Sequence, residues 1–312
     1  MGPTMRAFLM LMAAVAALVL TLAPPAHAAA PPDASPPTMH ADQLAWRRFA
    51  QLVSPAGPHR VEYETWASDA DIFTATPAWP GAAALEQKLL RPVARQPAFK
   101  RVALAPHYHA VADRCASAPQ PGQHPCVASE LRRNKASYHY IVRNGLHRHA
   151  ALGIDTPALR RAAPADAAEV EAHWVPVDTL ISWLARSGVR LKPSQVRARY
   201  YTTVAQGTSL ALVSLHLSAK AAPHWVHASF EHRSNPGRCD STGCHDRFGA
   251  SVARVAPATA ANQQYPACEQ SAALKQLFAS MRLADVWSHY CLKSSETDFA
   301  ARAIAAVRIA QL

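Results

Sequence analysis

The sequence predicts an α+β fold, in which helices flank an antiparallel sheet of four or more strands that is stapled by disulfide bonds. The hydrophobic pattern has a helical period near both ends of the chain and alternates with a period of two over about residues 168–235. Hydrophobic residues make up 50% of the 312 residues, which is enough to fill the core of one large domain. All six cysteines lie beyond residue 28, and an even number is typical of disulfide-bonded exported proteins.

The first 28 residues are typical of a secretory signal peptide. Arg6 precedes an apolar stretch over Phe8–Leu22, and Ala26-His27-Ala28 gives a small-x-small cleavage site. A proline-rich leader follows at residues 29–38, which we expect to be disordered, and a single α+β domain occupies residues 39–312. Since no second long apolar stretch follows, we expect a periplasmic or secreted protein without integral membrane association after cleavage.

The first half of the domain predicts short helices and long loops. Trp46, Phe49, Ala50 and Val53 recur at helical spacing, and Pro55 ends that helix. Residues 59–73 predict a short strand and a turn, and residues 74–130 are rich in loops, with one helix near Ala82–Leu90. Residues 130–149 predict a further helix that Asn144-Gly145 caps at its end.

From residue 168 onward the pattern predicts the sheet. Residues 168–177, 195–206, 209–220 and 224–232 are strand candidates rich in β-branched and aromatic residues. Thr179–Arg186 predicts a short helix or turn between the first two strands. Two helices are expected after the sheet, near Cys268–Met281 and at Asp298–Ile309.

The cysteines allow several pairings. Closeness in sequence favours Cys115–Cys126, Cys239–Cys244 and Cys268–Cys291, because short loops cost less entropy to close.

Alternation along the strands predicts one polar face of the sheet. Ala211, Val213, Leu215 and Leu217 form an apolar face, so that His216 lies on the opposite one. Applied to all four strands, the same alternation gathers a set of ionisable and aromatic side chains on the polar face: His173, Arg199, Tyr201, His216, His227 and Glu231. His232 belongs to the apolar face, unless the strand ends before it and lets it turn toward the site.

Such a face suits hydrolysis without a metal. A Glu or His can act as general base, a second His as general acid, and Arg can stabilise developing negative charge. The net charge of +11 favours polyanionic partners such as nucleic acid, anionic lipid or acidic polysaccharide. The alternative is a charge that is simply scattered over the surface, since the sequence has no dense run of Lys and Arg. The alternative is a non-enzymatic binding module, whose polar face is simply the solvated side of an antiparallel sheet.

Two cofactor alternatives stay open. His107/His109, His147/His149 and His224/His227 are closely spaced pairs of the kind that bind zinc or copper. Cys239, Cys244 and His245 form a C-x4-C-H sequence, a longer-spaced variant of the c-type haem attachment motif, which predicts a haem or redox protein.

Segments in the second half resemble a family of uncharacterised exported bacterial proteins, some labelled cytochrome-c-like. The strand LALVSLHLSAK is similar to that family's VGLHIxxK pattern, and HWVHASFEHRSN to its WxWxTFEHxxN pattern. The matching positions are Asn134, Glu169, Trp174, His216, Lys220, Trp225, Phe230, Glu231, His232 and Asn235. Glu171, His173 and His227 depart from the pattern.

The resemblance implies no established activity, but it shifts the site prediction toward the matching residues. The leading hypothesis is a hydrolase or lyase acting on a polyanionic or polar polymer. Glu231 or His232 would be the general base and His216 the acid, while Lys220 and Asn235 would bind the oxyanion or the substrate. Arg199 and Tyr201 are further candidates for substrate binding.

Overall fold

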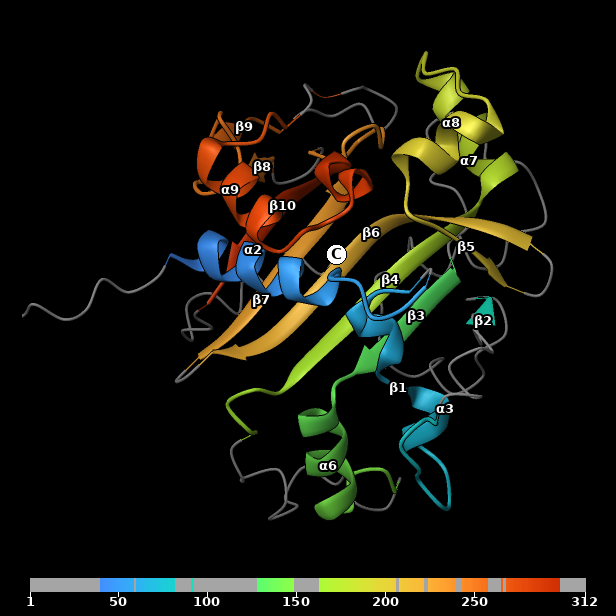
Figure 1. The fold of residues 1–312 in the computed structure, drawn as a ribbon, viewed down its shortest axis with the longest axis vertical. Coiled ribbons are helices and arrows are strands. Elements are labelled where there is room, and N and C mark those ends of the chain that lie inside the picture. The colour runs from blue at the N-terminus through green and yellow to red at the C-terminus, as the bar shows by residue number, and fades with distance from the viewer. Residues whose placement is uncertain are drawn as a thin grey trace, which may run out of the picture. The chain divides into compact units, whose positions relative to one another are not determined.

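A computed structural model describes most of the domain predicted from the sequence (Figure 1). The described residues are 40–58, 60–81, 91–92, 128–148, 163–205, 208–221, 224–239, 243–257, 265 and 268–297. The predicted signal peptide, the leader, the helices at Ala82–Leu90 and Asp298–Ile309, and the Cys115–Cys126 pair all lie outside them. None of the helices in the described ranges combines the length and the apolar character that a membrane crossing requires.

The predicted α+β class is confirmed by an eight-stranded sheet within the described residues, in which every pairing is antiparallel. Its order is β1-β3-β4-β6-β7-β10, with β2 on β3 and β5 on β6. The strands are β1 (Ala67–Ser68), β2 (Arg91–Pro92), β3 (Ala128–Arg133), β4 (Ala168–Pro176), β5 (Thr202–Ala205), β6 (Thr208–Ala221), β7 (His224–His232) and β10 (Tyr290–Glu296). A small hairpin-like pair, β8 (Cys244–His245) and β9 (Arg254–Val255), stands apart from this sheet.

One face of the sheet is covered by helix α2 (Ala41–Leu52), which crosses β6, β7 and β10 (Figure 1). The helix buries Trp46 and Phe49 against Phe230 of β7, with ring centroids 4.9 Å and 4.4 Å from that ring. Helix α9 (Ala272–Ser280), which lies within the helix predicted near Cys268–Met281, packs against α2 through Phe278. Burying these aromatic rings contributes to the hydrophobic stabilisation of the domain.

A β-bulge in β6 changes which side chains point to the other face of the sheet. The register between β4 and β6 shifts after His173, because Trp174 pairs with Leu212 while His173 pairs with Ser214, leaving Val213 as the extra residue. Ala211 and Val213 therefore face away from Leu215 and Leu217, and the prediction that these four residues share a face is wrong. The alternation is correct only on the C-terminal side of the bulge.

Helices α7 (Val177–Arg186) and α8 (Pro193–Arg199) cover the apolar half of this second face, at one end of the sheet (Figure 1). Leu180, Leu184 and Val196 pack there with Ala211 and Val213. The remaining, polar half of the second face carries no such apolar cluster among the described residues. Its side chains from β3, β4, β6 and β7 form the candidate site.

Two predicted elements differ from the structure. Residues 130–133 belong to strand β3, so the helix predicted over 130–149 is reduced to α6 (Lys135–Arg143), whose N-cap is Asn134. Its predicted end is correct, since Asn144 is the C-cap and Gly145 has φ +69°. Residues 193–199 form α8 rather than a strand, and only β5 remains of the strand predicted over 195–206.

The shorter elements also follow local signals. Residues 59–73 contain a 3-10 helix η1 (Glu62–Thr65), the two residues of β1, and a helical turn α3 (Asp69–Ile72). A second 3-10 helix, η6 (Asp285–His289), leads into β10.

Two predicted disulfides are confirmed: Cys239–Cys244, and Cys268–Cys291, which joins the segment before α9 to β10. Such bonds are typical of exported proteins.

Candidate functional site

Serine and histidine side chains pair across the strands on the polar half of the second face. His173 Nδ1 lies 2.9 Å from Ser214 Oγ, His216 Nδ1 lies 2.9 Å from Ser229 Oγ, and His227 Nδ1 lies 2.9 Å from Ser218 Oγ. Each pair consists of residues that are directly opposite each other in the antiparallel register. Direct partners in such a register share a face with Cβ atoms about 5 Å apart, which is why the pattern recurs.

One of these pairs extends to a carboxylate. The second ring nitrogen of His173, Nε2, lies 3.2 Å from Glu171 Oε1, which also accepts a 2.6 Å hydrogen bond from Ser129 Oγ. Ser214, His173 and Glu171 thus form a continuous hydrogen-bonded chain. If the His173 imidazole is neutral, its Nε2–H donates to the carboxylate and its Nδ1 accepts the Ser214 hydroxyl proton. A hydroxyl, a base and a carboxylate that orients the base, in this order, are one arrangement that activates a serine for nucleophilic catalysis.

The pKa values around this chain are strongly perturbed. Burial raises the pKa of Glu171, but the hydrogen bonds from His173 and Ser129 and the charge of His173 outweigh it and bring the pKa to about 2. Burial lowers the pKa of His216 to about 3, with a further contribution from His173, whose ring centroid is 4.9 Å away. At neutral pH Glu171 is therefore ionised and His216 is neutral.

Two cations of this face, Arg133 and Lys293, lie against carboxylates. Arg133 Nε is 2.6 Å from Glu169 Oε2, and its Nη1 also contacts Asp69. Lys293, the extra residue at a second bulge in β10, places Nζ 3.3 Å from Glu231 Oε1. Because these charges are balanced locally, the face itself is not a strongly basic surface, although the whole chain carries a net charge of +11.

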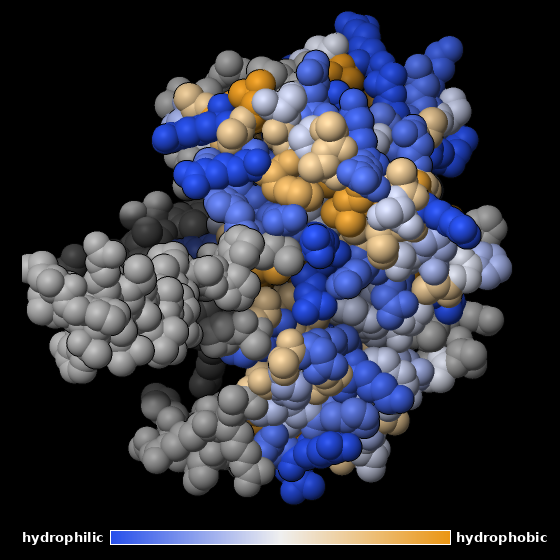
Figure 2. Space-filling view, turned by 60° about the vertical axis from the view of Figure 1, so that its left-hand side comes forward, coloured by the Kyte–Doolittle hydropathy of each residue, from blue (hydrophilic) through white to orange (hydrophobic). Residues whose placement is uncertain are grey.

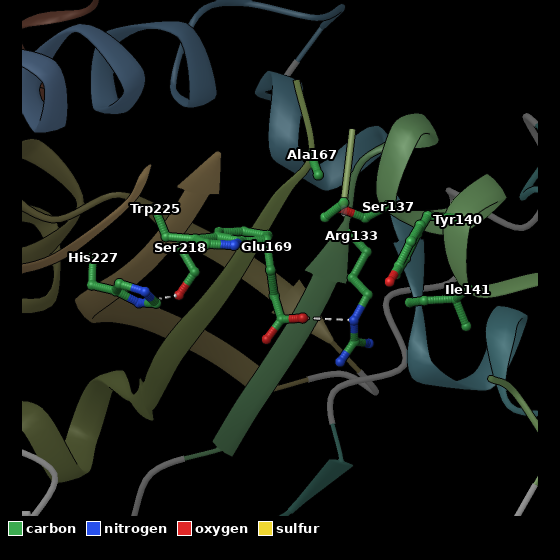
Figure 3. Close-up of a pocket in the computed structure, with 10 residues that line it drawn as sticks. Arg133, Ser137, Tyr140, Ile141, Ala167, Glu169, Ser218, Trp225 and His227 are labelled. Atoms are coloured by element: carbon green, nitrogen blue, oxygen red, sulfur yellow. Dashed lines mark hydrogen bonds and ion pairs between the residues drawn. The ribbon is translucent and has the colours of Figure 1, made fainter. Parts of the chain in front are cut away.

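A pocket of about 420 Å³ opens beside the serine–histidine pairs, between α6 and the strands (Figure 3). Glu169, Ser218 and His227 reach it from the sheet, and burial lowers the pKa of His227. Figure 3 shows Trp225 and Tyr140 on opposite sides of the Arg133–Glu169 ion pair. Apart from this pocket, hydrophilic residues cover most of the described surface visible in Figure 2, and hydrophobic residues form small groups among them.

The predicted site residues are divided between two places. His216 and Glu231 lie on the polar half, where Glu231 is the direct partner of Ser214. His232 is fully buried on the other side of β7, stacked on Tyr200, with its Nδ1 accepting from Ser234 N and its Nε2 3.2 Å from Arg199 O. Burial lowers its pKa well below the ordinary value. Both ring nitrogens are engaged with the backbone, so His232 holds the end of β7 in place.

The other predicted binding residues also serve the fold. The buried Asn235 donates its Nδ2 to Val213 O, the carbonyl of the bulged residue, at 2.8 Å. Arg199 ends α8, so its predicted place on a strand is wrong. Tyr201 lies just before β5 and donates its hydroxyl to Glu64 on the α2 side. Lys220 Nζ lies 5.9 Å from the ring centroid of Trp225, which lines the pocket.

The haem alternative does not fit these residues. The sulfurs of Cys239 and Cys244 are joined to each other, so in this state neither thiol can form a thioether to haem. His245 Nε2 accepts a 3.2 Å hydrogen bond from Arg247 Nε. For zinc, no cluster of three or more His, Cys, Asp or Glu ligands is found within the described part of the chain. His107, His109, His149 and the His224 side chain lie outside that part.

Comparison of the chain with protein-family models, with curated proteins and with solved structures finds no match. The geometry of the site therefore carries the functional argument. Sequence reasoning places His173 on the correct face but gives it little weight, because it departs from the family pattern. Alternation along the strands also puts Glu171 and Ser214 on that face, and this is the only sequence signal that could have identified them as site residues. Their connection through His173 requires the register of β4 with β6.

Proposed function

We propose that this chain is an exported hydrolase that removes small acyl groups from a polar polymer, using Ser214 as nucleophile and His173 as general base. The observation that supports this proposal is the hydrogen-bonded chain from Ser214 through His173 to Glu171. Of the hydrolase and lyase activities that the sequence suggested, we propose ester hydrolysis. The general base in this proposal is His173, in place of Glu231 or His232.

The proposed reaction proceeds in two steps. Ser214 Oγ attacks the ester carbonyl carbon while His173 Nδ1 takes the hydroxyl proton, and the ionised Glu171 stabilises the imidazolium through Nε2–H. His173 then gives the proton to the leaving alcohol oxygen as the bond between the acyl carbon and that oxygen breaks. Water, deprotonated by His173, hydrolyses the acyl-serine and restores the hydroxyl. His216, a neutral N–H donor beside His173, is assigned to stabilise the oxyanion.

The proposed acyl group is small because access to Ser214 is limited. Only 7% of the Ser214 residue surface is exposed, so an acetyl group reaches its hydroxyl more easily than a longer chain does. The charge balance of the polar half favours a polar polymer over a polyanionic one, since Arg133 and Lys293 already contact carboxylates. We also propose that residues 1–28 direct export to the periplasm or the medium, which the two disulfides support.

The test is hydrolysis of p-nitrophenyl acetate, butyrate and octanoate by the purified mature chain. We expect acetate to be the best substrate, and we expect Ser214→Ala and His173→Ala each to lower kcat/KM by about 10³-fold or more. Glu171→Gln should lower it by about 10²-fold, because the imidazole loses its orienting charge. Ser229 makes the same kind of hydrogen bond to His216, but within the described part of the protein no carboxylate is hydrogen-bonded to that histidine. Ser229→Ala should therefore lower kcat/KM by less than about tenfold.

Two further measurements complete the test. Ser182→Ala, an exposed serine of α7, is the control that should keep full activity. Labelling with diisopropyl fluorophosphate and peptide mass spectrometry should place the adduct on Ser214. The proposal is wrong if Ser214→Ala retains wild-type activity, or if the adduct forms on another serine.

A further inference from the structure

We propose that the pocket beside α6 binds an uncharged sugar unit of the polymer, so that the substrate is an acylated neutral polysaccharide. This inference rests on the proposed function for the identity of the reaction, but the binding itself can be measured without it. It names a ligand for the residues Arg133, Tyr140, Glu169, Trp225 and His227, which the esterase mechanism does not use.

The walls of the pocket have the two kinds of group that sugar recognition requires. The aromatic rings of Trp225 and Tyr140 offer flat apolar surfaces for the C–H faces of a pyranose ring (Figure 3). Between them, Glu169 presents carboxylate oxygens beside the Arg133 guanidinium, and these groups can accept from and donate to ring hydroxyls. The volume of about 420 Å³ is within the ordinary range for small-ligand pockets.

The charges of the pocket favour an uncharged ligand. Arg133 contacts both Asp69 and Glu169, so its positive charge is already more than balanced. Among the residues that line the pocket, Arg133 and Glu169 carry opposite charges and pair with each other, so their charges sum to zero. A carboxylated or phosphorylated sugar would have to compete with Asp69 and Glu169 for the guanidinium, whereas hydroxyl groups can bind without displacing either carboxylate.

The pocket lies in line with the proposed catalytic residues. Ser218, which lines the pocket, and Ser214 are on the same face of β6 with His216 between them, and Glu169 is two residues from Glu171 on β4. At about 3.3 Å per residue, the pocket is about 13 Å from Ser214 along the strand. A ligand unit in the pocket would therefore belong to the same polymer as the acylated unit and lie more than one sugar unit away from it, and its binding would position the ester.

Isothermal titration calorimetry tests the inference on the mature, disulfide-bonded chain. The probes are cellohexaose, maltohexaose and hexa-N-acetylchitohexaose, which are uncharged, and tetragalacturonate as the anionic counterpart. We expect at least one uncharged hexasaccharide to bind, and Trp225→Ala to weaken it by about tenfold or more. Trp225→Phe should restore most of the affinity, and Trp183→Phe, in α7 at the other end of the face, should leave it unchanged.

The outcomes separate the two proposals. The inference is overturned if only tetragalacturonate binds, if no probe binds, or if Trp225→Ala binds as well as the wild type. Binding should persist in Ser214→Ala. If sugars bind in the pocket but Ser214→Ala keeps esterase activity, the proposed function fails while the sugar site stands. If Ser214→Ala is inactive and no sugar binds, the function stands without this ligand.

Discussion

The two halves of the second sheet face share strands β4 and β6 but differ in what their side chains do. On one side of the Val213 bulge, Ala211 and Val213 pack under α7 and α8 in a closed apolar cluster. On the other side, Ser214 and His216 belong to a hydrogen-bonded polar network. Strand β6 also changes partner at this point, from β5 to β7.

The difference shows how a single extra residue can separate stability from chemistry. A regular strand that kept Ala211 and Val213 under α7 and α8 would place His216 on the opposite face, in the apolar core beneath α2. The bulge resets the alternation, so that the apolar half can be covered by helices while the polar half stays open to ligands. Substitutions should consequently affect stability in one half and activity in the other.

The largest expected difference in stability comes from truncating a buried side chain in the apolar half. Leu180 of α7 is fully buried, so Leu180→Ala should lower the free energy of unfolding by about 2–5 kcal/mol. Ser229→Ala, in the polar half, should lower it by about 1 kcal/mol or less, because it removes one half-exposed hydrogen bond. Urea denaturation with the disulfides intact measures both, and equal losses would refute the division between the two halves.

A smaller effect is expected at the boundary. Asn235→Ala leaves the buried carbonyl of Val213 without its 2.8 Å side-chain donor and should cost about 1–3 kcal/mol. Asn144→Ala is the matched control, since Asn144 also donates to a carbonyl, Tyr140 O, but at a half-buried helix end. The control should lose less than Asn235→Ala in the same urea titration; the reverse order would contradict a structural role for the bulge contact.

The smallest effect is a pH dependence that belongs to the polar half. The pKa of His216 is about 3 in the folded chain against an ordinary value of 6.5, so between these values the unfolded chain binds a proton that the folded chain does not. Stability should therefore fall as the pH falls from 6.5 toward 3. His216→Gln should make this slope shallower in urea titrations at pH 6.5 to 4.5, and an unchanged slope would show that His216 does not carry it.

Glu171 should also make the folded chain less stable as the pH falls, but at lower pH than His216 does. Its pKa is about 2 in the folded chain against an ordinary value of 4.5, so its stabilisation is complete above pH 4.5 and is lost as the pH falls toward 2. Glu171→Gln should remove this lower part of the acid dependence while leaving the part between pH 6.5 and 4.5. This separates the two groups in one pH series.

Local patterns predict some elements well and others poorly. Helix α2 and strands β4, β6 and β7 have strong periodic patterns, and the structure places them where the sequence predicts. Strand β3 resembles a helix in sequence because Leu131 continues the apolar stripe of α6, while pairing with β4 decides its conformation. For α8, the helix signals are Pro193 at the first turn and Gln195, whose side chain accepts from Lys192 N, and the strand-like pattern of the following residues obscures them.

The sequence by itself determined the fold class, the polar side chains of β4 and β7, and two of the disulfides, because alternation and short loop closure are local properties. Only the tertiary structure decided which polar residues meet. The bulge at Val213 sets the register that brings Ser214 to His173. It also turns Ala211 toward the apolar cluster under α7 and α8. The tertiary structure also shows that His232 and Asn235 hold the backbone of distant segments and do not belong to the site. Such contacts depend on strand pairings that no local pattern contains.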